Sequence, residues 1–137
     1  KFEMGVTQIL SSVEDENIFY VGSYDESISV IDKRMVKQEI GRTSVGGGVW
    51  RIKPHPKCPS LLLIAGMHSG FHVVKWNKDN GIFDTLCTYT KHGDGKNLGY
   101  GADWSHDPDL SLFSPVASTS SFYDRMQHLW QPKIKLQ

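Results

Sequence analysis

The stretch that decides the fold is Gly46-Gly47-Gly48-Val49-Trp50-Arg51-Ile52-Lys53-Pro54-His55-Pro56. Glycines tolerate backbone angles that residues with a Cβ avoid, so the first three residues suit a tight turn or a close approach. The next four favour a strand, and Pro-His-Pro is expected to end it because proline cannot donate to a strand ladder. Two more strand patterns follow, at 61–65 and 71–76. No helical period appears, so this part of the chain predicts loop, strand, strand, strand.

The same pattern recurs before and after this stretch. Three glycines open the first strand of each unit, 43 and then 53 residues apart: Gly5, Gly48 and Gly101. Three apolar or aromatic residues lie near the end of each third strand, 45 and then 54 residues apart: Ile31, Trp76 and Trp130. A period just above forty that ends in such a residue followed by Asp or Asn is typical of a propeller blade. The sequence therefore predicts an all-β fold, a WD-repeat β-propeller.

The repeats predict how the chain is divided. We expect one partial propeller domain over 1–137, with blades at about 1–43, 44–91 and 92–131 and a short C-terminal tail at 132–137. The third blade shows no outer strand, and three blades cannot close a ring, since propellers have about four to eight. The chain also begins with Lys1. We therefore expect an open arc from a larger ring of about seven blades, completed by missing N-terminal blades. The alternative is a half-ring completed by a partner.

The composition argues against several classes of partner and site. The 15 basic and 15 acidic residues balance, which argues against direct nucleic-acid binding. The longest apolar run is too short for a bilayer and no signal peptide is evident, so a cytoplasmic protein without a membrane partner is expected. Cys58 and Cys87 form no CxxC pair and are expected to be reduced thiols. Neither a metal nor a cofactor is expected, because His68 and His72 are joined by no cysteine cluster.

The candidate site lies in loops. In this type of propeller, the turns that enter the first strand of each blade share a face with the turns between its second and third strands. For acids in such turns, a structural role is favoured over a catalytic one, and the serine lacks the G-x-S-x-G context of a nucleophile. The candidate catalytic residues on this face are Asp25, Arg51, His68, Ser69 and Asp124.

Several motifs point to one family. They are Gly22-Ser23-Tyr24-Asp25-Glu26, Gly47-Gly48-Val49-Trp50-Arg51-Ile52-Lys53, Met67-His68-Ser69-Gly70-Phe71, Tyr100-Gly101-Ala102-Asp103-Trp104 and Ser121-Phe122-Tyr123-Asp124. In this order they resemble the C-terminal half of the diphthine methyltransferase family, over about Met4 to Trp130. The resemblance implies a WD-repeat protein of diphthamide biosynthesis that acts, despite the family name, as a carboxylic ester hydrolase. The substrate implied is diphthine methyl ester on translation elongation factor 2, and the product is diphthine.

Ester hydrolysis needs a base, donors for the oxyanion and a pocket for the rest of the substrate. His68 is the predicted base for water or for Ser69, oriented by one of the two aspartates. Arg51 and two glycine amides would stabilise the oxyanion. Aromatic rings and an acid would hold the trimethylammonium group of the substrate through cation–π and charge contacts. The predicted substrate-binding residues are Tyr24, Gly47, Gly48, Trp50, Tyr100, Asp103 and Tyr123.

The alternative function is a non-catalytic WD-repeat scaffold for protein interactions. The chain carries no hydrolase motif, and on this interpretation the same face is a docking surface with Arg51 and the aromatic residues as its main contacts. Convergence of His68 with Asp25 and Asp124 would favour an enzyme, whereas separation in different blade turns would favour docking. A three-blade arc by itself is expected to lack part of the active site.

Overall fold

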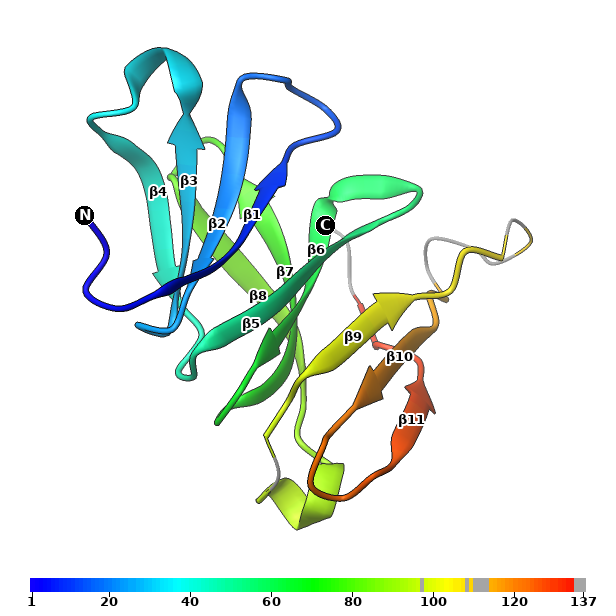
Figure 1. Ribbon diagram of the computed structural model, residues 1–137. Coiled ribbons are helices and arrows are strands. Elements are labelled where there is room, and N and C mark those ends of the chain that lie inside the picture. The colour runs from blue at the N-terminus through cyan, green and yellow to red at the C-terminus, as the bar shows by residue number, and fades with distance from the viewer. Residues whose placement is uncertain (97, 108, 110–113, 135–137) are drawn as a thin grey trace.

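The computed structural model describes residues 1–96, 98–107, 109 and 114–134, which form three antiparallel sheets (Figure 1). The first sheet contains β1 (Val6–Ser11), β2 (Ile18–Ser23), β3 (Ser27–Asp32) and β4 (Glu39–Ser44). The second contains β5 (Val49–His55), β6 (Cys58–Gly66), β7 (Gly70–Asn77) and β8 (Ile82–Tyr89). The third contains β9 (Gly101–Trp104), β10 (Ala117–Ser120) and β11 (Gln127–Trp130). The all-β prediction is confirmed.

Short helices lie only in connections within the described residues. They are the 3₁₀-helices η1 (Lys33–Met35) and η2 (His92–Gly95). No helix in these ranges has the length and apolarity needed to cross a membrane. In each sheet the strands follow one another in chain order as a meander, so every hairpin turn falls at one of two ends of the sheet. This order is what gathers loops from different sheets.

The apolar run at 61–65 becomes the centre of the molecule because β6 is buried on both faces. Leu62 and Ile64 pack in a cluster with residues of the first sheet. Leu61, Leu63 and Ala65 pack in a second cluster with residues of the third sheet. A strand with both faces buried needs an uninterrupted apolar sequence, because successive side chains point to opposite faces. Each buried leucine contributes about 1.5–3 kcal/mol, so β6 holds the three sheets together.

The four tryptophans divide into three that join the sheets and one at the loop surface. Trp76 is buried between the first two sheets, where it packs in one cluster with residues of the first sheet and its ring centroid lies 4.9 Å from that of Phe83. Trp130 of β11 stacks on Tyr89 of β8, at 4.4 Å and 10°. Trp104 is buried, and its Nε1 donates a 3.0 Å hydrogen bond to the carbonyl of Lys53. Trp50 keeps 40% of its surface exposed, so it is available to a ligand.

The prediction that the strand stops before Pro54 is wrong. β5 continues through Pro54 to His55, with a register shift between these two residues. β5 pairs only with β6, so its other edge carries no ladder hydrogen bonds. A proline is tolerated on such an edge, because its missing N–H interrupts no ladder there. The edge position of the strand therefore overrides the local effect of proline.

The two predicted sets of turns meet on one face. The Met67 amide donates to the Gly48 carbonyl at 2.8 Å, and the Gly99 amide donates to the Met67 carbonyl at 2.9 Å. In the first sheet, the Val45 amide donates to the Glu26 carbonyl at 2.9 Å. Figure 1 shows η2 beside the turn that joins β10 to β11, at the lower end of the third sheet. Backbone hydrogen bonds therefore tie the loops that carry the predicted site residues.

Candidate functional site

The glycine run lies directly against the turn between β6 and β7. A Cβ on Gly47 would lie 2.7 Å from the Ser69 nitrogen and 2.8 Å from the Ser69 Oγ, so only glycine fits there. A Cβ on Gly48 would lie 3.2 Å from the ring of Tyr24. Gly46 has φ +76°, an angle that glycine adopts readily. Two consecutive glycines therefore place Ser69 and Tyr24 on either side of one short segment.

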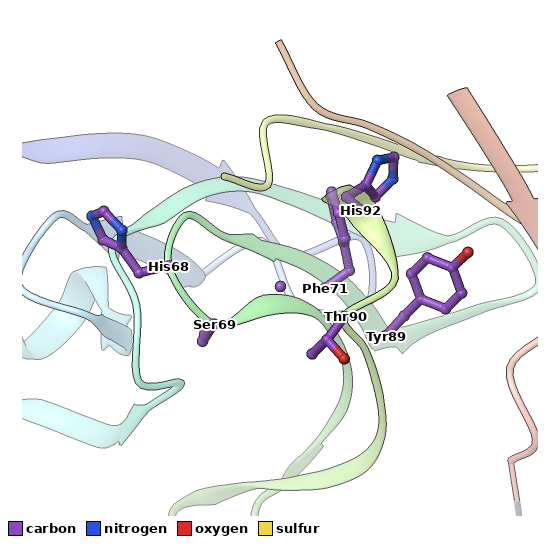
Figure 2. A pocket seen from close by; sticks show the side chains of 7 residues that line it. His68, Ser69, Phe71, Tyr89, Thr90 and His92 are labelled. Atoms are coloured by element: carbon purple, nitrogen blue, oxygen red, sulfur yellow. The ribbon is translucent and has the colours of Figure 1, made fainter. Parts of the chain in front are cut away.

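Ser69 is hydrogen-bonded to a buried histidine. Its Oγ lies 2.7 Å from Nε2 of His72, and Nδ1 of the same ring lies 3.2 Å from Oγ1 of Thr88. His72 is 7% exposed, and burial lowers the pKa of its imidazole below the ordinary value. Ser69 is partly exposed and borders a small cavity of about 50 Å³ (Figure 2). The arrangement joins the hydroxyl of a partly exposed serine to a buried imidazole whose pKa is lowered.

His68 lies apart from this pair. It is exposed, and its ring in Figure 2 points away from Tyr89 and His92 on the other side of the cavity. Among the described residues, no hydrogen bond joins His68 to Ser69 or to either predicted aspartate. The structure therefore does not bring the predicted base and its orienting acids together, which by the criterion given above counts toward docking.

Asp25 is bound within the first sheet. Its carboxylate accepts hydrogen bonds from the Ser27 hydroxyl and amide, from the Glu3 amide at 3.2 Å, and from Nη2 of Arg42 at 2.9 Å. Burial raises the pKa of Asp25, but the hydrogen bonds from Ser27 and Glu3 outweigh it and leave the pKa below its ordinary value. These contacts fix the turn between β2 and β3, the structural role that the sequence favoured.

Asp124 ends a chain of hydrogen bonds through the third sheet. The Trp130 Nε1 donates to Oγ1 of Thr119 at 3.2 Å, and that oxygen lies 3.1 Å from Nε2 of His92. The Nδ1 of His92 donates to the Asp124 carboxylate at 2.8 Å. Burial raises the pKa of Asp124, but the Met126 amide and His92 lower it by more. Thr119 and His92 are almost fully buried, so this chain anchors η2 to the sheet.

Aromatic side chains from the second and third sheets meet at the loop face. The rings of Trp50 and Tyr100 lie 5.5 Å apart at 90°, and those of Tyr100 and Tyr123 lie 6.3 Å apart. Burial raises the pKa of the Tyr100 phenol, and Tyr123 and Tyr24 raise it further. A β-bulge between Val49 and Arg51 leaves Trp50 without a ladder partner, and bulges commonly re-aim such a side chain. We call Tyr24, Trp50, Tyr100 and Tyr123 the aromatic cluster.

An open depression of about 540 Å³ borders this cluster, lined by Tyr100, Ser120, Ser121, Phe122 and Tyr123. Ser121 is 4% exposed, and its hydroxyl has no hydrogen-bond partner among the described residues. Two remaining predicted residues lie on the innermost strands. Arg51 is exposed on β5, and Asp103 on β9 pairs with Nζ of Lys53 at 3.0 Å. Asp103 is therefore already neutralised by a lysine.

Known proteins similar in sequence share one name. No family model matches the chain. The diphthine methyltransferase homolog of Dictyostelium discoideum is 38% identical over 133 residues, which cover 95% of this chain and 36% of the relative. Human diphthine methyltransferase is 47% identical over 102 residues, which cover 74% of this chain and 23% of the relative.

The chain belongs to the diphthine methyltransferase family. It spans about a third of the length of the Dictyostelium relative and less of the human one. The predicted resemblance is thereby confirmed.

Solved structures establish the architecture of this family member. The Dos1 propeller superposes with a TM-score of 0.68 at 14% identity, over 93% of this chain and 32% of that one. A chain of a mitotic checkpoint complex superposes with a TM-score of 0.69 at 14% identity, over 92% of this chain and 36% of that one. U3-55K gives 0.67 at 13% identity, over 99% and 39%. Such low identity shows the fold alone, and the prediction of an arc of about three propeller blades is confirmed.

One group of side chains in this diphthine methyltransferase homologue has the composition of a metal site. The ligand atoms of His92, Asp124 and His128 lie within 4.8 Å of one another. The two imidazole rings are stacked, with their centroids 3.9 Å apart and an angle of 12° between their planes. The nitrogen lone pairs of each ring lie in its plane, so those of the two rings lie in nearly parallel planes. Both nitrogens of His92 are also occupied by Asp124 and Thr119. In this arrangement the group forms part of the hydrogen-bonded anchor of η2.

Sequence reasoning missed His72 as a partner of Ser69 and His92 as a partner of Asp124. The spacing Ser-x-x-His across a hairpin was the one local signal for the first pair. His92 and Asp124 are 32 residues apart and meet only because η2 folds back on the third sheet. No local pattern encodes that contact, so the histidine in the Gly-rich loop gave no sign of its burial.

Burial of His72 predicts that the protein loses stability in mild acid. Because the folded pKa is depressed, the unfolded chain takes up a proton below the ordinary pKa of 6.5 that the folded chain refuses. The stabilisation is complete above 6.5 and is lost as pH falls from there through the folded pKa. Urea denaturation between pH 7 and 5 should show this decline, and His72→Gln should flatten it. An equal slope in the variant would contradict the assignment to His72.

Proposed function

We propose that the protein containing this chain hydrolyses the methyl ester of diphthine methyl ester on translation elongation factor 2, giving diphthine. The reaction is a step of diphthamide biosynthesis and would take place in the cytoplasm. Membership of the diphthine methyltransferase family supports this pathway. The observation that carries the proposal is the aromatic cluster beside the serine-bearing turn, because the substrate has a quaternary ammonium group near its ester.

The aromatic cluster suits the ammonium group of the substrate. Quaternary ammonium ions bind to the faces of Trp and Tyr rings, at about 0.5–2 kcal/mol for each good contact. Trp50, Tyr100 and Tyr123 are in ring contact, and Gly48 packs against Tyr24. The cluster therefore provides a surface for the trimethylammonium end.

The glycine run suits the ester end. Hydrolysis develops negative charge on the carbonyl oxygen, which preorganised N–H donors stabilise. Among the described residues, no acceptor is recorded for the amides of Gly47 and Gly48. Arg51 follows the glycine run on β5, where its exposed side chain adds a positive charge. Gly47 contacts the turn at Ser69, and Gly48 contacts Tyr24. The two glycine amides therefore lie between the turn that carries Ser69 and the aromatic cluster.

The test is demethylation of elongation factor 2 that carries the methylated intermediate. The product of the complete gene should hydrolyse the methyl ester to the acid and release methanol, seen by mass spectrometry as a net loss of one CH₂ from the modified peptide. A protein that leaves verified substrate unchanged would remove the enzymatic proposal. The scaffold alternative, which exposed aromatic residues such as Phe122 also suit, would then be favoured. It predicts binding of a partner protein at the same face without turnover.

Trp50→Ala is expected to raise KM for the methylated factor roughly 2- to 30-fold, the loss of one cation–π contact. The turnover number should change less, because the indole contacts the ammonium group and not the ester. The matched control is a substrate peptide with a neutral tert-butyl group in place of trimethylammonium. The variant and the original protein should hydrolyse this peptide with similar KM. An equal rise in KM for both peptides would mean that Trp50 supports the loop and does not bind the charge.

A further inference from the structure

We infer that Ser69 and His72 form the nucleophile and general-base pair of this site, with Thr88 as a positioning residue for the imidazole. The inference rests on the proposed ester hydrolysis and assigns its chemistry to specific atoms. It places the base on β7, inside the sheet, and gives His68 no part in proton transfer.

The geometry of the pair carries the inference. A nucleophile and its base must lie within about 2.6–3.2 Å of each other, and a third group should orient the base. The distance from Ser69 Oγ to His72 Nε2 is 2.7 Å, and Thr88 Oγ1 lies 3.2 Å from Nδ1. With its proton on Nδ1, the imidazole donates to Thr88 and accepts the proton of Ser69. Burial also keeps the imidazole neutral near pH 7, the form in which it acts as a base.

Two glycines leave room for the pair. A Cβ on Gly66 would lie 2.5 Å from Ser69 Oγ and 3.3 Å from His72 Nε2, so any larger residue there displaces the hydroxyl. On the other side, a Cβ on Gly47 would lie 2.8 Å from the same oxygen. The hydroxyl therefore sits between two glycine backbones, one of which carries the amides proposed to stabilise the oxyanion. The packing around Ser69 and the proposed reaction therefore both require glycine at positions 47 and 66.

The competing Asp–His–hydroxyl chain in the third sheet has the composition of a catalytic triad but lacks access. Its hydroxyl belongs to Thr119, which is 1% exposed and already accepts a hydrogen bond from Trp130. A substrate carbonyl cannot approach a nucleophile that is covered in this way. Ser69 is partly exposed, and its hydroxyl has His72 as its recorded partner. The exposure of the residue that carries the hydroxyl therefore distinguishes the Ser69–His72 pair from the Thr119–His92 pair.

The proposed chemistry balances in two steps. Ser69 Oγ bonds to the ester carbonyl carbon as its proton moves to His72 Nε2, and the tetrahedral intermediate expels methoxide, which leaves as methanol with that proton. Water then attacks the acyl-serine, giving its proton to His72. The Ser69 oxygen leaves and recovers that proton, which releases the carboxylic acid and restores the pair. The net reaction is ester plus water to acid plus methanol, and it needs no further reagent.

The first experiment measures demethylation by the product of the complete gene. Ser69→Ala is expected to lower turnover by on the order of 10³ or more, and His72→Gln by roughly 10²–10⁴. Thr88→Val should lower kcat about tenfold with KM unchanged, and Thr88→Ser should restore it. Ser60→Ala, at the end of β6 far from the turn that carries Ser69, is the matched control and should keep full activity. Loss of activity on His68→Ala, with His72→Gln active, would overturn the inference.

A second readout does not depend on the substrate. A fluorophosphonate reagent should label Ser69, identified by peptide mass spectrometry, and labelling should fall with His72→Gln. If the protein labels at Ser69 but leaves the methylated factor intact, the proposed function fails and the reactive pair stands. If the protein demethylates its substrate while Ser69→Ala and His72→Gln stay within twofold of it, the pair is wrong and the esterase stands. Thermal unfolding of each variant separates lost chemistry from lost structure.

Discussion

Gly66→Ala is expected to lower ester hydrolysis about a hundredfold or more, the contribution of a displaced general base, while the protein stays folded. The new Cβ would lie 2.5 Å from Ser69 Oγ, far inside contact distance, so the hydroxyl must turn away from His72. Gly66 has no positive φ, so alanine fits its backbone and also reduces the entropy of the unfolded chain. A large loss of rate should accompany a small change in stability. Single-turnover demethylation and urea denaturation measure the two effects.

The matched control for this prediction is Gly5→Ala. A Cβ on Gly5 would meet no atom within 4 Å, and Gly5 also lacks a positive φ. This variant should keep the rate of the original protein. If Gly66→Ala retains more than a third of the rate, the hydroxyl position imposed by the Ser69–His72 hydrogen bond is not needed for the reaction. A Gly66→Ala protein that fails to fold would instead show that the clash is resolved by the backbone.

His92→Ala is expected to reduce the free energy of unfolding by about 3–4 kcal/mol, because a buried ring and two hydrogen bonds are lost together. The ring is 2% exposed and joins the Asp124 carboxylate to the Thr119 hydroxyl. Its removal leaves Asp124 with one donor fewer and opens a space beside the His128 ring. Equilibrium denaturation in urea measures the change.

His106→Ala serves as the comparison for that substitution. The His106 side chain is 71% exposed, and its Nε2 lies 3.9 Å from the Asp103 carboxylate. Exposed pairs of this kind contribute at most about 1 kcal/mol, so this variant should unfold near the original midpoint. A His92→Ala protein within 1 kcal/mol of His106→Ala would show that the hydrogen-bonded chain is not an anchor, whatever its geometry.

The strands could be predicted from the sequence because their signals are local. Alternation and turn residues locate β7, predicted at 71–76, to within one residue at each end, and the uninterrupted apolar run at 61–65 predicts a strand buried on both faces. The effect of Pro54 was predicted wrongly because it depends on which edge of the strand is unpaired. The pairing of strands cannot be deduced from the sequence of one strand alone. The fold is thus accessible where each residue acts through its neighbours in sequence.

The candidate site could likewise be predicted only in part. The aromatic cluster and the glycine run were predicted as parts of one face, because repeats place equivalent turns together, and their contacts are found. Hydrogen-bond partners were not predictable. Asp124 meets His92 from 32 residues away, and Arg42, chosen by none of the motifs, holds Asp25. Which charged or polar groups meet depends on side-chain directions that only the packed sheets determine.

The aromatic cluster draws its rings from the strands and loops of three different sheets, and this has a consequence for engineering its selectivity. The spacing of the rings depends on how each sheet is tilted against the next, and that tilt is set by distant contacts such as the indole of Trp104 on the carbonyl of Lys53. A small rotation at such a contact between sheets would change the distances from Tyr24 and Trp50 to Tyr100 without altering any of these residues. Mutant libraries aimed at bulkier or smaller ammonium groups should therefore include residues at the contacts between sheets as well as the aromatic residues themselves.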